Sequence, residues 1–257
     1  MTVDNFNLDS VLTKTPIEKI KKRDDIVRYI RNFAYNEGFI ELETPPFQRK
    51  YGSVECAYSL ILNGINNMYE INNDFRLDKV DKTHLPYPKL FYIYSSSIDN
   101  KSFIDFAERF IKDLVYNVNG GYELDYNGNL INFKRKFKKV TINQMNTRRD
   151  NNYIQPTFVV NKNPTGVHTE VYIGNLEVGD ARSIKIPLTN GMGAINVYMA
   201  GFGVDRLSML LTDSSDINEV TQFPIIEADI ENLLLSNKVS YEELRNVRKR
   251  IKLNETQ

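Results

Sequence analysis

Apolar residues recur at helical spacing in two long segments of the chain. The first, residues 16–37, ends beside Gly38, a residue type that commonly stops helices. The second covers residues 98–118. Because each segment is apolar on one face only, the pattern predicts two amphipathic helices. The apolar positions are Ile17, Ile20, Val27, Ile30, Phe33 and Ala34 in the first, and Phe103, Ile104, Phe106, Ala107, Phe110, Ile111 and Leu114 in the second.

Three other segments are rich in aromatic and β-branched residues, which is typical of strands: residues 67–75, 89–95 and 167–173. Pro45-Pro46 breaks the strand expected after the first helix. Residues 117–132 are polar and turn-rich, which predicts a surface hairpin or loop. Helices alternating with hairpin-like strands favour an α+β fold.

Length and composition are those of an enzyme domain. A chain of 257 residues is enough for one large domain with a real core. Its 33 basic and 33 acidic residues cancel, so net charge does not indicate a polyanion-binding protein. The single cysteine, Cys56, excludes an internal disulfide, and we expect a reducing, cytoplasmic location. No apolar run approaches the roughly 18 residues of a membrane span, and we expect no membrane partner.

Residues 200–212 have the types suited to binding a polyphosphate. Gly201 and Gly203 come before Asp205-Arg206, and residues 207–211 are expected to form an apolar helix. Glycines leave the backbone open to close approach. The guanidinium is always charged and presents several donors in a planar fork. The alternative interpretation is a packed turn with a surface arginine.

Two further segments with distinctive residues precede this stretch in the sequence. Gly38-Phe39-Ile40-Glu41-Leu42-Glu43-Thr44-Pro45 follows the first helix. The second segment contains Phe75-Arg76-Leu77-Asp78 and Thr83-His84-Leu85-Pro86 and ends in Phe91-Tyr92-Ile93-Tyr94. Together with residues 200–212 they resemble motifs 1, 2 and 3 of the class II aminoacyl-tRNA synthetases. The closest resemblance is to the lysyl, aspartyl and asparaginyl subgroup, whose closing pattern matches Ile217, Val220 and Phe223-Pro224.

This resemblance implies a fold and an assembly. The fold is α+β, an antiparallel sheet flanked by helices, with a catalytic domain at 1–224 and a short helical extension at 225–257. Motif 1 of the family builds a two-fold interface, so a homodimer is expected. Because the first helix begins by about residue 16, we expect the family's anticodon-binding barrel to be missing. Only residues 47–58 stand where the family has several dozen, including part of the amino-acid pocket.

The resemblance also implies ATP and Mg²⁺ as cofactors. Arg76 corresponds to the arginine that contacts the α-phosphate, Arg206 to the one on the γ-phosphate, and His84 to a histidine near the far end of the triphosphate. Asp78, Tyr87 and Gly203 complete the implied ATP site. Pro88 replaces the phenylalanine that stacks on adenine, and Tyr87 is its possible substitute.

Two glutamates seven positions apart correspond to the family's metal ligands. Glu170 and Glu177 flank Gly174-Asn175, a pair that favours a tight turn, so both carboxylates are expected to converge from adjacent strands. Carboxylate and phosphate oxygens are the usual ligands of Mg²⁺. The alternative is two solvated glutamates on either side of a hairpin.

The implied amino-acid pocket departs from the lysyl pattern. Tyr92 and Ile184 stand where lysyl enzymes have acidic residues that meet the substrate's ammonium. An unpaired buried ammonium is costly, so lysine is not the expected substrate. Arg182 is a candidate reader of a carboxylate, as in aspartyl enzymes. Tyr92, Tyr94, Gly179 and Ile184 are alternatively the lining of a pocket for an apolar or aromatic side chain.

Two basic stretches are candidates for binding nucleic acid. Residues 134–139 favour an exposed strand with solvated lysines, and the stripe Leu244, Val247 and Ile251 predicts a helix that docks onto protein rather than RNA. The leading hypothesis, favoured by the expected lack of an anticodon domain and by the presence of Arg76, Arg206 and the glutamate pair, is a ligase that forms an aminoacyl-adenylate and passes the aminoacyl group to an amine, either ammonia, a small molecule or a protein. A minimal synthetase that charges tRNA and a non-catalytic accessory subunit are the alternatives.

Overall fold

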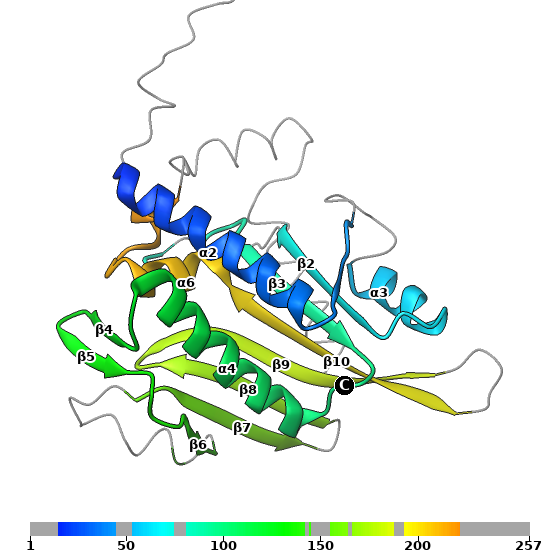
Figure 1. Ribbon diagram of the computed structural model, residues 1–257. Coiled ribbons are helices and arrows are strands. Elements are labelled where there is room, and N and C mark those ends of the chain that lie inside the picture. The colour runs from blue at the N-terminus through cyan, green and yellow to red at the C-terminus, as the bar shows by residue number, and fades with distance from the viewer. Residues whose placement is uncertain are drawn as a thin grey trace, which may run out of the picture.

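A computed structural model of the chain describes residues 15–44, 53–74, 81–141, 144, 155–163, 166–187 and 193–221 (Figure 1). Its helices are α2 (Ile17–Asn36), α3 (Ser53–Leu62), α4 (Asn100–Asn119) and α6 (Val204–Leu211), followed by a 3-10 turn, η1 (Ile217–Glu219). None of the described helices is both long and apolar enough to cross a membrane.

One mixed sheet of eight strands organises the molecule. Its order is β1-β2-β3-β10-β9-β8-β7-β6. The strands are β1 (Ile40–Glu41), β2 (Asn67–Asn73), β3 (Lys89–Ser95), β6 (Lys138–Val140), β7 (Thr157–Asn163), β8 (Gly166–Ile173), β9 (Leu176–Pro187) and β10 (Ala194–Gly203). The α+β fold predicted from the sequence is confirmed. The expected antiparallel pairing holds for the six central strands, whereas β1 with β2 and β6 with β7 pair in parallel. Parallel pairing requires a crossover, and the chain between β1 and β2 contains α3.

A separate hairpin joins β4 (Glu123–Tyr126) to β5 (Asn129–Asn132). It lies within residues 117–132, where a hairpin or loop was predicted. Asn127 and Gly128 both have positive φ, 52° and 72°, which is the backbone of a two-residue hairpin turn.

The core lies between one face of the sheet and the helices α2 and α4, which cross that face side by side (Figure 1). Aromatic rings meet at its centre, where Phe110 contacts Phe33, Phe91 and Phe202. Helix α4 begins at Asn100 because the Asp99 carboxylate accepts a hydrogen bond from the Ser102 N–H. It ends at Gly120, whose left-handed φ of 75° suits glycine.

Several predicted elements differ from the observed ones at their ends. The predicted strand 67–75 ends at Asn73, and Phe75 lies outside the described residues. The predicted exposed strand at 134–139 begins only at Lys138. No element was predicted at α3 or over most of β10. Pro45-Pro46, Phe223-Pro224 and the extension 225–257 also lie outside the described part of the chain.

Candidate active site

The second face of the sheet carries polar residues where its register aligns five strands. Glu70, Tyr92, Gly201, Asp180 and Glu170 are successive partners across β2, β3, β10, β9 and β8. Side chains alternate between the two faces of a strand, so partners in one row share a face. This row, called the acidic row below, contains three carboxylates and a glycine at its centre.

A bulge brings a further carboxylate onto the same face. Tyr172 pairs with Glu177, but its neighbour Val171 pairs with Gly179, so Val178 is an extra residue in β9. A bulge of this kind re-aims the residues beside it. It places Glu177 on the face that carries Asp180, although the two are three positions apart.

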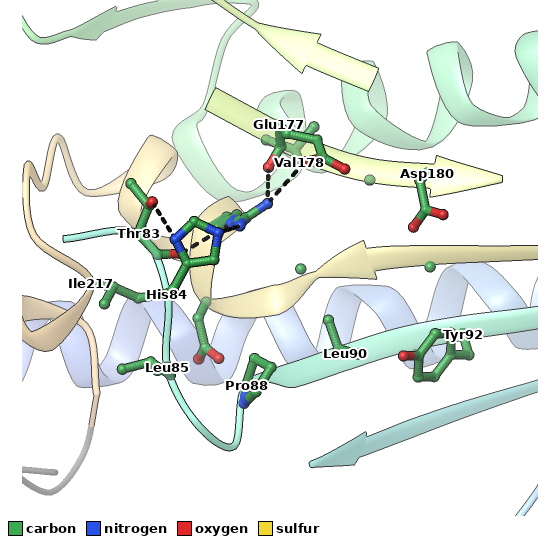
Figure 2. Close-up of a pocket in the computed structure, with 15 residues that line it drawn as sticks. Thr83, His84, Leu85, Pro88, Leu90, Tyr92, Glu177, Val178, Asp180 and Ile217 are labelled. Atoms are coloured by element: carbon green, nitrogen blue, oxygen red, sulfur yellow. Dashed lines mark hydrogen bonds and ion pairs between the residues drawn. The ribbon is translucent and has the colours of Figure 1, made fainter. Parts of the chain in front are cut away.

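A pocket opens on this face beside the first turn of α6 (Figure 2). Its lining includes Thr83, His84 and Leu85 from the loop before β3, Glu177 and Asp180 from β9, and Arg206 from α6. Figure 2 shows Asp180 and Tyr92 farther along the strands than Glu177 and His84. The pocket therefore has an end with Arg206 and His84 and an end formed by the acidic row.

Arg206 is held in one orientation by three neighbours. Its Nε donates to the Thr83 carbonyl at 3.2 Å, and its Nη1 donates to the Glu177 carbonyl at 2.9 Å. Nη1 also lies 3.6 Å from the Glu177 carboxylate. The side chain is 21% exposed, so the guanidinium is fixed but reachable from the pocket.

His84 links Arg206 to Asp81. Its Nε2 lies 3.0 Å from Arg206 Nη2, and its Nδ1 lies 2.8 Å from Asp81 Oδ1. A guanidinium only donates, so Nε2 accepts and the imidazole proton is on Nδ1, where it is donated to Asp81. Burial opposes ionisation of Asp81, but hydrogen bonds from Thr83 and His84 outweigh it and lower the pKa of Asp81 to about 2.

Asp205, next to Arg206, also lines the pocket, but its carboxylate makes different contacts. Its side chain is 3% exposed, is paired with Arg23 of α2 and accepts the Lys89 N–H at 2.7 Å. Within the described residues, Nε of Arg23 is buried and has no partner. Asp205 thus links α6 to α2 and β3 at the edge of the pocket.

The two predicted metal ligands, Glu170 and Glu177, lie on adjacent strands with Gly174 and Asn175 in the turn, as the sequence predicted. Burial raises the pKa of Glu177; Arg206 opposes that shift, and Asp180 and Glu170 add to it. Among the described residues, no group of three or more His, Cys, Asp or Glu side chains is arranged to hold a metal ion. Two carboxylates fit Mg²⁺ when phosphate and water oxygens complete its shell.

His168 lies between two of these carboxylates. Its Nε2 is 3.4 Å from Asp180 Oδ2, and its Nδ1 is 3.7 Å from Glu170 Oε1. The hydrogen bond to Asp180 raises the pKa of His168 against the effect of burial, and the neighbouring carboxylates add to the rise. His168 therefore partly offsets the negative charge of the acidic row.

The structure brings some predicted site residues together and separates others. Of the ATP-site residues, Arg206, His84 and Gly203 line the pocket, and Arg76 and Asp78 lie outside the described residues. Pro88 lines it, but Tyr87 does not, so the pocket does not support Tyr87 as the substitute for the adenine-stacking residue. Of the amino-acid pocket residues, Gly179 and Tyr92 line it, whereas Tyr94, Arg182 and Ile184 do not.

Two of these departures have a clear physical reason. Tyr94 is 1% exposed because α3 packs over it. Its hydroxyl donates a hydrogen bond to Glu70 at 2.8 Å. Arg182 is exposed and lies in the next row of the register, opposite Met199. Tyr94 and Arg182 are therefore not part of the pocket lining seen here, and their assignment to the substrate pocket stays a prediction.

The glycines before α6 lie in a strand, and the predicted close approach of a phosphate to them stays a prediction. Both Gly201 and Gly203 are strand residues of β10, not a turn. A Cβ on Gly201 would lie 2.9 Å from the Tyr92 ring, so its lack of a side chain makes room for that ring. Gly203 lines the pocket, and a Cβ there would make ordinary contact with Arg206 at 3.5 Å.

Gly179 gives a direct test of this packing. A Cβ at Gly179 would lie 2.6 Å from Phe202 Cδ1 and 2.8 Å from the Gly201 carbonyl oxygen. Gly179→Ala is therefore expected to lower the free energy of unfolding by about 2–3 kcal/mol, the cost of overpacking a rigid core. Gly121→Ala is the control, because nothing lies within 4 Å of its Cβ position. Urea denaturation measures both, and equal stabilities would contradict the packing role.

Sequence reasoning did not find three polar residues at this site: Asp81, His168 and Asp180. His168 was one of only two histidines in the chain, which was the available signal. Asp81 and Asp180 carried none, because their positions depend on a loop conformation and on a bulge.

Comparison with known proteins adds to this geometry. The family described as tRNA synthetases class II (D, K and N) matches residues 58–172. A lysine–tRNA ligase of Vesicomyosocius okutanii is 22% identical over 87% of this chain and 67% of its own length. Lysine–tRNA ligase 2 of Methanosarcina acetivorans is 25% identical over 52% of the chain, and the enzyme of Mycoplasma genitalium 30% over 47%. The matches span 31% and 29% of the lengths of these last two proteins.

The family match, to class II tRNA synthetases over a little under half of the chain, agrees with the eight-stranded sheet and with the pocket beside α6. Within that class, the match is to the group that acts on aspartate, lysine and asparagine, with lysine–tRNA ligases as relatives. The resemblance derived from the three motifs is confirmed. The alignment with the Vesicomyosocius enzyme is 335 residues long although this chain has 257, so that relative has internal segments that this chain lacks.

Proposed function

We propose that this chain is an ATP-dependent ligase that activates an amino acid as its adenylate and transfers the aminoacyl group to an amine other than tRNA. The observation that carries the proposal is the fixed guanidinium of Arg206, bonded to His84 and facing Glu177 at one end of the pocket. Reactions at phosphorus are accelerated mainly by such positioning and electrostatics.

Different residues along the pocket would bind the phosphates, the metal ion and the amino acid. Arg206 and His84 would hold the outer phosphates of ATP, and Arg76, from the resemblance, the α-phosphate. Glu170 and Glu177 would hold Mg²⁺, which neutralises charge that develops on the phosphates. The acidic row would lie beside the amino acid, whose carboxylate attacks the α-phosphorus while pyrophosphate leaves. The protein's contribution is to align these groups.

The charges around the pocket support an acceptor other than tRNA. Glu170, Glu177 and Asp180 lie on the open face, and carboxylates repel a phosphate backbone. At the basic stretch 134–139, Lys134 and Lys136 line a groove of mixed charge, which also contains Arg109, Lys112, Asp105, Glu108 and Asp113. The names of the relatives favour the alternative, a minimal synthetase that charges tRNA.

The proposal is tested by ATP–pyrophosphate exchange across a panel of amino acids. We expect exchange with at least one amino acid, dependent on Mg²⁺. A protein that binds no ATP by calorimetry and shows no exchange would be a non-catalytic accessory subunit instead.

The acceptor is tested with labelled adenylate formed on the enzyme. One sample receives total tRNA, and the other receives ammonia, small amines and protein lysines. We expect label in an amide and weak tRNA binding. Binding through phosphates would fall by roughly one power of salt per contact, which a salt titration detects. Label in tRNA that mild base releases would establish the minimal synthetase.

An isologous homodimer through motif 1 belongs to the same proposal. Tyr35 of α2 and Ile40 of β1 are 77% and 56% exposed, which suits an apolar contact. Light scattering at micromolar concentration is expected to give twice the mass of the 29.8 kDa chain. A monomer at that concentration would contradict the prediction, and Tyr35→Glu should weaken the dimer without lowering the stability of the fold.

A further inference from the structure

Helix α3 covers one end of the polar sheet face. It comes from the short segment between motifs 1 and 2, in which residues 47–58 replace a longer part of the family pattern. Its residues Ala57 and Ile61 are 0% and 4% exposed. They belong to one apolar cluster with Met68, Tyr94, Val197 and Met199 of the sheet. The helix is therefore part of a packed layer and does not lie loosely on the surface.

The sheet register shows what α3 covers. One row beyond the acidic row, Met68, Tyr94, Met199 and Arg182 are successive partners across β2, β3, β10 and β9. The first three of these are 0%, 1% and 8% exposed. If α3 did not cover this row, a long substrate side chain that points away from Arg206 would lie against it. Here the space above it is filled by Ala57 and Ile61.

The acidic row is consequently where the pocket ends. Tyr92, Gly201 and Asp180 line the pocket, but no described residue of the next row does. The Tyr92 hydroxyl is held by Asp74 at 3.2 Å, and its ring lies against the bare Cα of Gly201. Beyond this ring, the residues Met68, Tyr94 and Met199 of the next row are buried in one cluster with Ala57 and Ile61 of α3.

We infer, building on the proposed function, that α3 restricts the activated amino acid to one with a short side chain, such as glycine, alanine or serine. The triphosphate takes the Arg206 end, and the amino acid lies toward the acidic row. A longer side chain would have to enter the packed layer of Ile61, Met199 and Tyr94. Packed cores accept added methylenes only with strain, and one misfitting methylene changes selectivity by about tenfold or more.

The test uses non-hydrolysable aminoacyl-adenylate analogues, because binding can be measured whether or not turnover occurs. Calorimetry compares analogues of glycine, alanine, 2-aminobutyrate, norvaline and lysine on the full chain. We expect the affinity to fall by about tenfold or more for each methylene beyond the optimum at a short side chain. Equal or tighter binding of the norvaline or lysine analogue would overturn the inference and leave the proposed function standing. If none binds, the proposed function fails, and the inference with it.

Variants of α3 and its partner strand locate the restriction. Ile61→Ala should improve binding of the norvaline analogue relative to the alanine analogue by about tenfold. Leu62→Ala is the matched control, since Leu62 is the next residue but is 44% exposed, and the ratio should not change. If Ile61→Ala does not fold, Met199→Ala opens the same layer from β10. A ratio unchanged in a folded Ile61→Ala or Met199→Ala protein would show that α3 does not set the length limit.

Discussion

Asp205→Ala is expected to lower the free energy of unfolding by about 3–5 kcal/mol, because it leaves a buried guanidinium without its counter-charge. Arg23 and Asp205 have side chains only 11% and 3% exposed. The substitution also removes the acceptor of the Lys89 N–H. Denaturation in urea, followed by circular dichroism, measures the loss.

Two further variants separate a buried pair from a surface pair. Arg28→Ala removes an exposed ion pair with Asp24 on the same helix as Arg23, and should change stability by less than about 0.5 kcal/mol. Arg23→Met combined with Asp205→Leu should lose less stability than the two single changes added together, since neither charge is then left alone. Additive losses would mean that the two charges do not interact.

The consecutive residues Asp205 and Arg206 have different roles: Asp205 has a structural role, and Arg206 is a candidate phosphate-binding residue. A helix turns its successive side chains about its axis, so neighbours point in different directions. Here both residues line the pocket, but Asp205 is bonded to α2 and β3, whereas Arg206 is bonded to Thr83, Glu177 and His84. A sequence pattern that contains both residues therefore indicates how a helix is held in place as well as a candidate phosphate site.

Local patterns predicted the elements whose stability is mostly local. The predicted helices 16–37 and 98–118 match α2 and α4, and the predicted strand 89–95 matches β3. Helix α3 was not predicted, although its ten residues run to Leu62. A helix of that length is marginal alone and depends on its packing against Tyr94 and Met199, which no local pattern reveals.

The site could be predicted where the family motifs fix it. His84 and Arg206 are 122 positions apart in the sequence, yet they are hydrogen-bonded. Asp180 was not predicted to line the pocket, because only the extra residue Val178 puts it on the same face as Glu177. Tyr94 does not line this pocket, because α3 packs over it. Bulges and covering helices are tertiary features, and spacing in the sequence does not specify them.

Arg206→Ala is expected to raise the dissociation constant for ATP by about 10- to 100-fold, from the loss of charge-assisted hydrogen bonds worth about 1.5–3 kcal/mol. Arg206→Lys should recover little of this, because an ammonium cannot reproduce the guanidinium's separate bonds to Thr83, Glu177 and His84. Calorimetry with Mg²⁺-ATP measures both variants.

The control for Arg206 is Arg109→Ala, which removes an arginine that is 53% exposed and paired with Glu37, far from the pocket lining. It should leave ATP affinity unchanged. The partner variant, His84→Ala, should weaken ATP binding less than Arg206→Ala, since a neutral imidazole offers one hydrogen bond and no charge. Because His84 also orients Arg206, the double variant should lose less than the two single losses combined. An Arg206→Ala protein that is folded and binds ATP as well as the original chain would remove the central support for phosphate binding at this pocket.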